Sequence, residues 1–400
     1  MGSMITLRLG RLEVDWGKNN FFTNHSALFR ETDLSEADCL REDGVVERKP
    51  AFVRRLGNVV PRLELLGYDL EGCRRTYDEA VRRIPDFYPA MSVTFDAFRE
   101  ALCRVDPDRI DVDAYEADCD PGEFARTILG DPAFGESLPS GLTDDDGLFF
   151  ENLDAYVVLR LLAENPANLD RDLVWDIADV VDGGWVEDGH IFEPLDERKR
   201  LLIVTEGSSD SNVLRTALQL VSPVVADFFD FVDMRENYPF TGTGHLVNFC
   251  KGLAAIRVQN RIVVVLDNDT AGHVAMRKLM ELRMPANIRL VGLPDLEDFR
   301  NFPTVGPSGR TNEDVNGRAV AIECFLDLTY GPREDPVVRW TGFDKAANAY
   351  QGELVSKDLY TRRFFDRARE DGYDLGKLRI LWQHILRACT GAPTRLDVAA

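Results

Sequence analysis

The sequence predicts an α/β protein in which a mostly parallel sheet, flanked by helices, follows an N-terminal α+β domain and precedes a helical C-terminal tail. Over residues 199–330, short apolar runs alternate with helical patterns, as in strands that are joined by crossover helices. Two of these runs end abruptly in acidic residues. The preceding part of the chain combines alternating strand patterns with helical stripes, which indicates a separate α+β domain.

The central sheet is expected to contain four strands, at residues 200–205, 228–233, 261–266 and 287–293. The first and third runs are almost entirely apolar, so both faces of these strands would be buried. Helices are expected between the strands, one of them from Ser211 to about Leu220. A loop rich in Gly, Pro and Asn is expected at residues 303–317, followed by a helix from Arg318 to Leu328.

The flanking parts of the chain carry weaker patterns. Residues 4–30 look β-rich, residues 45–130 mostly helical, and residues 131–150 like a loop. Helical spacing near the end of the chain predicts a helical tail. We therefore expect three domains, which are an N-terminal α+β domain (residues 4–197), a catalytic domain (198–330) and a C-terminal helical extension that completes the core (331–400).

Composition limits the class of protein. The chain has 400 residues, 44% hydrophobic and 29% charged, which is typical of a globular protein. No apolar run approaches the roughly 20 residues of a membrane span. The seven cysteines form no CxxC pair, which favours reduced thiols and a cytoplasmic location over a zinc ribbon. The net charge of -22 counts against a broad, passive nucleic-acid-binding surface but not against a local site where metal cancels the carboxylates.

Acidic side chains stand at the ends of two expected strands. Glu206 ends the first strand and Asp210 follows it, while Asp267 and Asp269 end the third strand. Neighbouring parallel strands would place all four at one edge of the sheet, where ligands bind in open α/β folds. Carboxylate oxygens suit Mg²⁺, which orients a phosphodiester and activates water. Taken singly, each residue is explained better as a helix cap or a turn residue, whereas together at two neighbouring strand ends they favour a metal site.

The two motifs resemble the TOPRIM domain, the metal-binding module of topoisomerases, bacterial primases and several nucleases. Glu206 in Val-Thr-Glu-Gly matches its glutamate, and Asp267 and Asp269 in Leu-Asp-Asn-Asp-Thr-Ala-Gly match its aspartate pair. The resemblance covers residues 199–330 and implies a TOPRIM-like sheet. It also implies acid/base or metal work for the glutamate and Mg²⁺ (or Mn²⁺) binding for the aspartates.

Within TOPRIM proteins, the later part of the chain is similar to the OLD nuclease branch. That branch adds an acid four residues after the glutamate, a further carboxylate downstream and a lysine. Asp210 fits the first, and Glu323 and Lys357 are the candidates for the others, with the lysine stabilising charge on the phosphate. No GxxxxGK[ST] motif exists, so the ATPase that accompanies OLD nucleases is absent from this chain.

The whole architecture resembles the bacterial HEPN/Toprim-associated family. The stretches that carry this resemblance are Asp-Trp-Gly-Lys-Asn at residues 15–19 and Asn-Gly-Arg-Ala-Val-Ala-Ile-Glu at residues 316–323. In that family, an N-terminal domain like residues 4–195 precedes a TOPRIM domain or a HEPN ribonuclease domain. The resemblance implies a role in bacterial defence against phage and other mobile DNA.

Three histidines are further candidates for site residues. His245 and His273 stand at expected helix starts near the site and are candidates for substrate binding, although an ordinary polar role explains each of them. His384 completes the pattern RφxxxH of HEPN ribonucleases with Arg379. That pattern lies in an apolar helix, and packing explains it better.

We therefore expect a divalent-metal-dependent endonuclease with Glu206 and Lys357 as catalytic residues. Its metal ligands would be Glu206, Asp210, Asp267, Asp269 and Glu323. Its substrate would be DNA or RNA, and sequence alone does not separate the two. The alternative is a non-catalytic TOPRIM-like scaffold that binds a partner protein or senses a phage component. A partner protein that supplies activation or a basic surface, and a homo-oligomer, both stay open.

Overall fold

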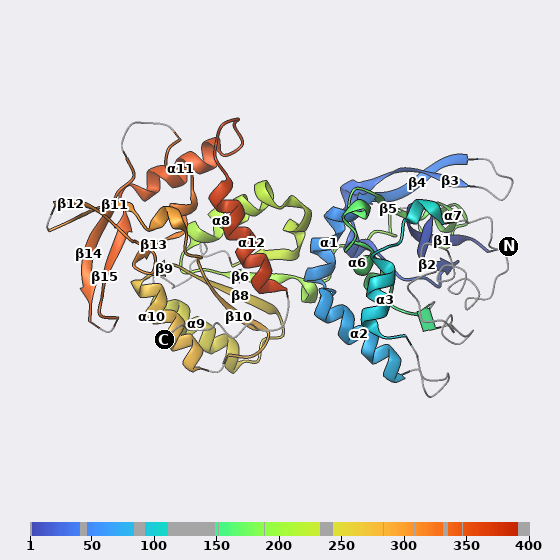
Figure 1. The fold of residues 1–400 in the computed structure, drawn as a ribbon, viewed down its shortest axis with the longest axis horizontal. Coiled ribbons are helices and arrows are strands. Elements are labelled where there is room, and N and C mark those ends of the chain that lie inside the picture. The colour runs from blue at the N-terminus through green and yellow to red at the C-terminus, as the bar shows by residue number, and fades with distance from the viewer. Residues whose placement is uncertain are drawn as a thin grey trace. The chain divides into compact units, whose positions relative to one another are not determined.

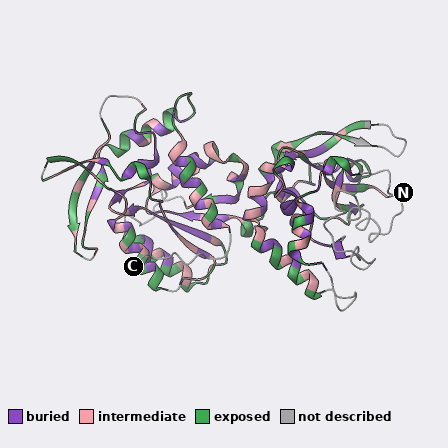
Figure 2. Cartoon of the chain, in the orientation of Figure 1, coloured by how far each residue is buried: buried purple, intermediate pink, exposed green. Residues whose placement is uncertain are grey.

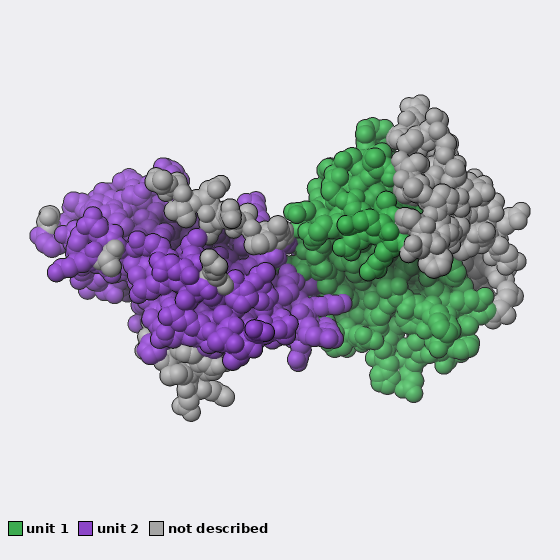
Figure 3. Space-filling view, turned by 90° about the horizontal axis from the view of Figure 1, so that it is seen from below, with its two compact units in different colours: residues 1–195 green, residues 196–400 purple. Residues whose placement is uncertain are grey.

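The computed structural model divides into two compact units, residues 1–195 and 196–400, which are described separately (Figure 3). None of the helices described is long and apolar enough to cross a membrane. The structure describes residues 2–40, 46–83, 93–110, 149–150, 152–187, 189–232, 243–282, 284–307, 309–330, 335–345 and 347–390.

Unit 1 is built on a five-stranded antiparallel sheet with the strand order β2-β1-β5-β4-β3 (Figure 1). The turn between β1 and β2 falls at Gly10, whose φ of 57° explains the glycine. Trp175 and Phe52 are fully buried beneath the helices, with ring centroids 5.6 Å apart. The strands are β1 (Met4–Leu9), β2 (Leu12–Lys18), β3 (Leu34–Leu40), β4 (Val46–Arg55) and β5 (Asp172–Asp176).

The helices of unit 1 include two that the sequence predicts from their apolar stripes, α1 and α2. The expectation that residues 45–130 are mostly helical is wrong for β4, a charged segment that pairs with a strand on each side. Residues 111–148, which contain most of the expected loop at 131–150, lie outside the described residues. The helices are α1 (Leu56–Leu65), α2 (Leu70–Arg83), α3 (Phe95–Leu102), α6 (Ala155–Leu162) and α7 (Ala178–Asp182).

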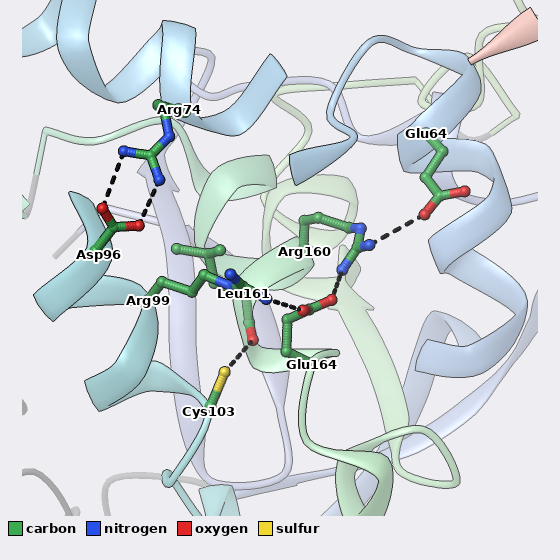
Figure 4. A network of polar contacts seen from close by, with 8 residues as sticks. All are labelled: Glu64, Arg74, Asp96, Arg99, Cys103, Arg160, Leu161 and Glu164. Carbon is green, nitrogen blue, oxygen red and sulfur yellow. Dashed lines mark hydrogen bonds and ion pairs between the residues drawn. The ribbon is translucent and has the colours of Figure 1, made fainter. Parts of the chain in front are cut away.

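A network of charged side chains around a buried arginine joins three of these helices (Figure 4). Arg160 of α6 is only 9% exposed and forms ion pairs with Glu164 and, at 3.1 Å, with Glu64 of α1. Arg99 of α3 also contacts Glu164, at 2.8 Å. Moving one helix away would leave a buried charge without its partner, which is costly. These ion pairs therefore hold the helices in their relative positions.

Unit 2 contains the expected parallel sheet, with the strand order β10-β8-β6-β7. All four predicted strands are confirmed. The central strands β6 and β8 are almost wholly buried, while the outer faces of the helices are exposed (Figure 2). Apolar side chains of α9 and α10 pack on one face. On the other face, Trp382 of α12 packs against Phe229 of β7 and donates a hydrogen bond to the Leu214 carbonyl of α8. The strands are β6 (Leu201–Val204), β7 (Phe229–Phe231), β8 (Arg261–Leu266) and β10 (Ile288–Gly292), and the helices are α8 (Ser208–Val221), α9 (Thr243–Ala255), α10 (Thr270–Glu281) and α12 (Gly376–Cys389).

A second, four-stranded sheet in unit 2 corrects two expectations. Residues 303–317 are not a loop but form most of a hairpin, which turns at Gly309 with a φ of 96°. The segment before α11 is also a hairpin rather than part of a helical tail. The sheet has the order β12-β11-β14-β15, with β11 (Phe302–Gly306), β12 (Gly309–Glu313), β14 (Val338–Asp344) and β15 (Ala349–Leu354), and α11 (Lys357–Arg367) follows it.

The helix expected from Arg318 to Leu328 is also wrong. Residues Ala319–Val320 form the short strand β13, which pairs with β9 (Asn268–Asp269), and a 3₁₀ helix follows at Ile322–Phe325. Almost every side chain of this segment is buried, so its apolar residues do not mark one helical face. Pairing with β9 brings this segment to the carboxyl edge of the parallel sheet.

Candidate active site

Glu206 lies in a tight turn between β6 and α8. The Thr205 hydroxyl donates to the Gly207 carbonyl at 2.7 Å and is hydrogen bonded to the Ser211 hydroxyl at 2.8 Å. The Gly207 N–H donates to Asp210 Oδ2 at 3.0 Å. This bond begins α8 at Ser208, earlier than the sequence predicts, and it holds Asp210 back toward the turn that carries Glu206.

The second acidic pair stands where β8 ends and α10 begins. Asp269 caps α10, because its Oδ1 accepts from the Gly272 N–H at 2.7 Å. Its Oδ2 accepts from Gln351 Nε2 of β15 at 2.5 Å. A Cβ at Gly272 would lie 2.1 Å from the Asp267 carbonyl oxygen, so this tight turn requires glycine. No hydrogen bond to the Asp267 carboxylate is present among the residues that the structure describes.

The asparagine between the two aspartates fixes the neighbouring loops. Asn268 is buried, and its side-chain amide donates to Asp295 at 2.6 Å. Its Oδ1 accepts from the Gly317 N–H at 3.0 Å and is hydrogen bonded to His273 Nε2 at 2.9 Å. The alternation Asp-Asn-Asp therefore serves two purposes, since the amide holds the loops while the two carboxylates remain at the sheet edge.

Glu323 and Lys357 reach the same place from the later part of the chain. Glu323, in the 3₁₀ helix, is only 5% exposed. Lys357 is the first residue of α11 and follows Ser356, whose φ of 60° is uncommon for a residue other than glycine. A cation at a helix N-terminus also opposes the helix dipole. Two local preferences are thus broken at the position where a lysine faces the carboxylates, and such conflicts cluster at functional sites.

Burial and neighbouring negative charges raise the pKa values of two aspartates in this group of carboxylates. Burial, followed by the charges of Asp210 and Asp269, raises the pKa of Asp267 well above its usual range. Burial and the Glu323 carboxylate raise the pKa of Asp210 to about 7. Lys357 therefore compensates only part of the negative charge of the carboxylates. A bound cation would reduce the remaining repulsion between them.

The pKa values of the two predicted catalytic residues are also shifted by this group. Burial and Asp269 raise the pKa of Glu206, against a hydrogen bond from the Thr243 backbone at the start of α9. Burial lowers the pKa of Lys357, but the carboxylates of Glu323 and Asp210 outweigh burial, so the pKa is raised overall. Lys357 thus stays fully charged at neutral pH.

The donor set suits a hard divalent cation, although the side chains do not form a closed cage. Among the described residues, no three His, Cys, Asp or Glu side chains are arranged to hold one metal ion together. Mg²⁺ does not require such a cage, because it keeps several waters and commonly takes only one or two carboxylates from the protein. All candidate ligands are carboxylate oxygens, the type that Mg²⁺ and Mn²⁺ prefer over softer donors.

The structure does not add the predicted histidines to the carboxylate group. His273 is exposed and is hydrogen bonded to Asn268, so it takes part in loop packing. His245 lies exposed in the first turn of α9, two residues after Thr243. In the RφxxxH pattern, Arg379 is exposed and His384 is hydrogen bonded to the Gly292 carbonyl at 3.0 Å, which supports the packing interpretation.

Sequence reasoning missed two residues that position the carboxylates. Gln351 holds Asp269, and its side-chain oxygen also accepts from the Ala271 N–H at 3.0 Å. Its strand was not predicted, and no motif surrounds it. The backbone contact from Thr243 to Glu206 had a signal, because the stretch Thr-Gly-Thr-Gly before a helix is suited to presenting N–H groups to an anion.

The N-terminal part of the chain matches a known domain family. The family model described as HEPN/Toprim N-terminal domain 1 matches residues 1–199. Residues 1–199 are a HEPN/Toprim N-terminal domain. This confirms that part of the predicted resemblance, and the match includes all of unit 1. No curated protein and no solved structure matches the chain.

Proposed function

We propose that this chain is a divalent-metal-dependent endonuclease that hydrolyses phosphodiester bonds in DNA or RNA, with unit 2 as its TOPRIM-like catalytic domain. The observation that carries the proposal is that carboxylates and one lysine from separate segments at the carboxyl edge of a parallel sheet shift one another's pKa values. The HEPN/Toprim N-terminal domain supports it, since its family is named after Toprim domains. On the same family resemblance, we place the activity in bacterial defence against phage or mobile DNA.

The residues take distinct roles in this proposal. One or two of the carboxylates of Asp267, Asp269, Asp210 and Glu323 would hold Mg²⁺ or Mn²⁺ together with bound waters, and the metal would supply Lewis acidity and an activated water. Glu206 exchanges a proton with the reacting groups, and its raised pKa brings it closer to neutral pH, where such transfer is most effective. Lys357 places a fixed positive charge beside the phosphate oxygens on which negative charge develops.

The scaffold alternative has one observation in its favour. Asp210 and Asp269 both act as helix caps, as purely structural residues would. Capping does not explain Asp267 and Glu323, which add negative charge to a buried group at a cost in stability. A scaffold would have no reason to keep that charge, whereas a metal site requires it.

The proposal is tested by incubating the pure protein with plasmid DNA and with total tRNA in EDTA, Mg²⁺ or Mn²⁺, beside Asp267→Ala. We expect cleavage of at least one substrate only with metal, and a loss of about 10³-fold in the variant, because metal contacts supply several kcal/mol to the transition state. Unchanged cleavage by Asp267→Ala would show that another site is responsible. No cleavage, together with no stabilisation by metal, would favour the scaffold.

A further inference from the structure

A hollow outside the carboxylate group lies between α8 and the edge strand β7. Its volume is about 470 Å³. Arg215 and Gln219, one helical turn apart, line it from α8, and Phe231 and Asp230 line it from β7. The contacts reported for the carboxylate group do not involve the residues that line this hollow. We call it the Arg215 hollow.

Arg215 is held in place without using its hydrogen-bonding groups. Its guanidinium carbon lies 5.3 Å from the centroid of the Phe231 ring, which itself packs near Trp382. Stacking uses the face of the guanidinium and leaves its in-plane N–H donors available. Within the described part of the chain, Arg215 forms no ion pair, and the nearby Asp230 is paired with Arg200 at 3.4 Å. A half-buried arginine with unused donors is suited to an oxyanion such as phosphate, because its planar guanidinium can donate to two oxygens at once.

The Arg215 hollow lies within reach of the carboxylate group. Phe231 pairs in register with Ile203 of β6, and Glu206 is three residues beyond Ile203. Three residues span at most roughly 10 Å of chain. Arg215 also stands seven residues after Ser208, so the two lie on the same side of α8 about two turns apart. Each strand of a B-form duplex carries one phosphate per roughly 3.4 Å of helix axis, so a separation of this order corresponds to a few nucleotides of such a strand.

We propose that the Arg215 hollow binds a backbone phosphate of the substrate strand, a few nucleotides from the bond that is cut. Arg215 donates to the phosphate oxygens, Gln219 offers an amide beside it, and Phe231 keeps the guanidinium in orientation. This proposal rests on the proposed nuclease function and adds a subsite to it. It also gives the acidic chain a local cationic contact with nucleic acid that does not depend on a basic surface.

The test measures binding and catalysis separately on the full-length protein. Binding of a fluorescent single-stranded oligonucleotide in EDTA is titrated across salt concentrations for wild type, Arg215→Ala, Arg215→Lys and the control Arg277→Ala on the exposed side of α10. Arg215→Ala should weaken binding about tenfold and reduce the slope of log affinity against log salt by about 0.7. Arg215→Lys should keep the slope but lose affinity, because lysine cannot form the bidentate contact.

Catalysis is compared on two substrates with Mn²⁺. Cleavage of the oligonucleotide should fall in Arg215→Ala, whereas hydrolysis of bis(4-nitrophenyl) phosphate, a diester without neighbouring phosphates, should not change. Equal affinity and salt slope in wild type and Arg215→Ala, or no binding by wild type, would overturn the subsite. Equal loss on both substrates would also overturn it, because Arg215 would then act at the cut bond. No hydrolysis by wild type counts against the nuclease function alone, and the binding comparison still decides the subsite.

Discussion

Asp267→Asn should make the metal-free protein more stable while removing its response to divalent metal. Burial and the charges of Asp210 and Asp269 raise the pKa of Asp267, so its ionised form is disfavoured in the folded state. The neutral amide has nearly the same shape and removes that repulsion. Thermal unfolding at pH 8 in EDTA should therefore show a higher Tm for the variant than for wild type.

Metal should reverse the order of the two proteins. Wild type should gain stability with increasing Mg²⁺ or Mn²⁺, as binding to the folded state alone requires, and Asp267→Asn should not. The matched control is Asp366→Asn, an exposed aspartate of α11, which should follow wild type with and without metal. A variant that is less stable than wild type in EDTA would show that Asp267 serves the fold and not a cation.

The stability of the metal-free protein should also depend on pH through Asp210. Its pKa is raised to about 7 by burial and by Glu323, against roughly 3.9 in an unfolded chain. The folded state then binds more protons than the unfolded state between about pH 4 and pH 7. The contribution of Asp210 to the free energy of unfolding is therefore fully present below about pH 4. It falls between about pH 4 and pH 7 and is constant above pH 7.

The contribution of Asp210 is isolated by comparing wild type with Asp210→Asn in EDTA. The two should be similarly stable near pH 4, and the variant should become the more stable as pH rises to 7. The difference should grow by up to roughly 1.4 kcal/mol per pH unit for one proton. Urea unfolding at several pH values measures it. A difference that is independent of pH would mean that Asp210 carries its ordinary pKa and that its cap to Gly207 is its main role.

The sequence predicted the parallel sheet because its strands are long apolar runs with few competing patterns. Residues 261–266 form β8 over the predicted range, and the acids at the ends of β6 and β8 follow directly from that assignment. The second sheet could not be predicted in the same way. Strand β12 is almost fully exposed and polar, so its pairing depends on β11 rather than on its own composition.

The later site residues were located by resemblance and not by local pattern. Glu323 was expected on a helix, yet it lies in a 3₁₀ helix that β13 positions by pairing with Asp269. Its proximity to Asp210 depends on this long-range pairing, which no short window of sequence contains. Gln351 was missed for the same reason, since its contact with Asp269 requires the hairpin of β14 and β15.

Binding of Mn²⁺ decides whether the carboxylate group is a metal site at all. Free Mn²⁺ can be followed by electron paramagnetic resonance while wild type, Asp267→Asn and Asp366→Asn are titrated at pH 8. We expect wild type and Asp366→Asn to remove one or two Mn²⁺ ions per chain from solution, and Asp267→Asn to bind far more weakly. Equal binding by all three proteins, or no binding by wild type, would contradict the assignment of this group as the catalytic metal site.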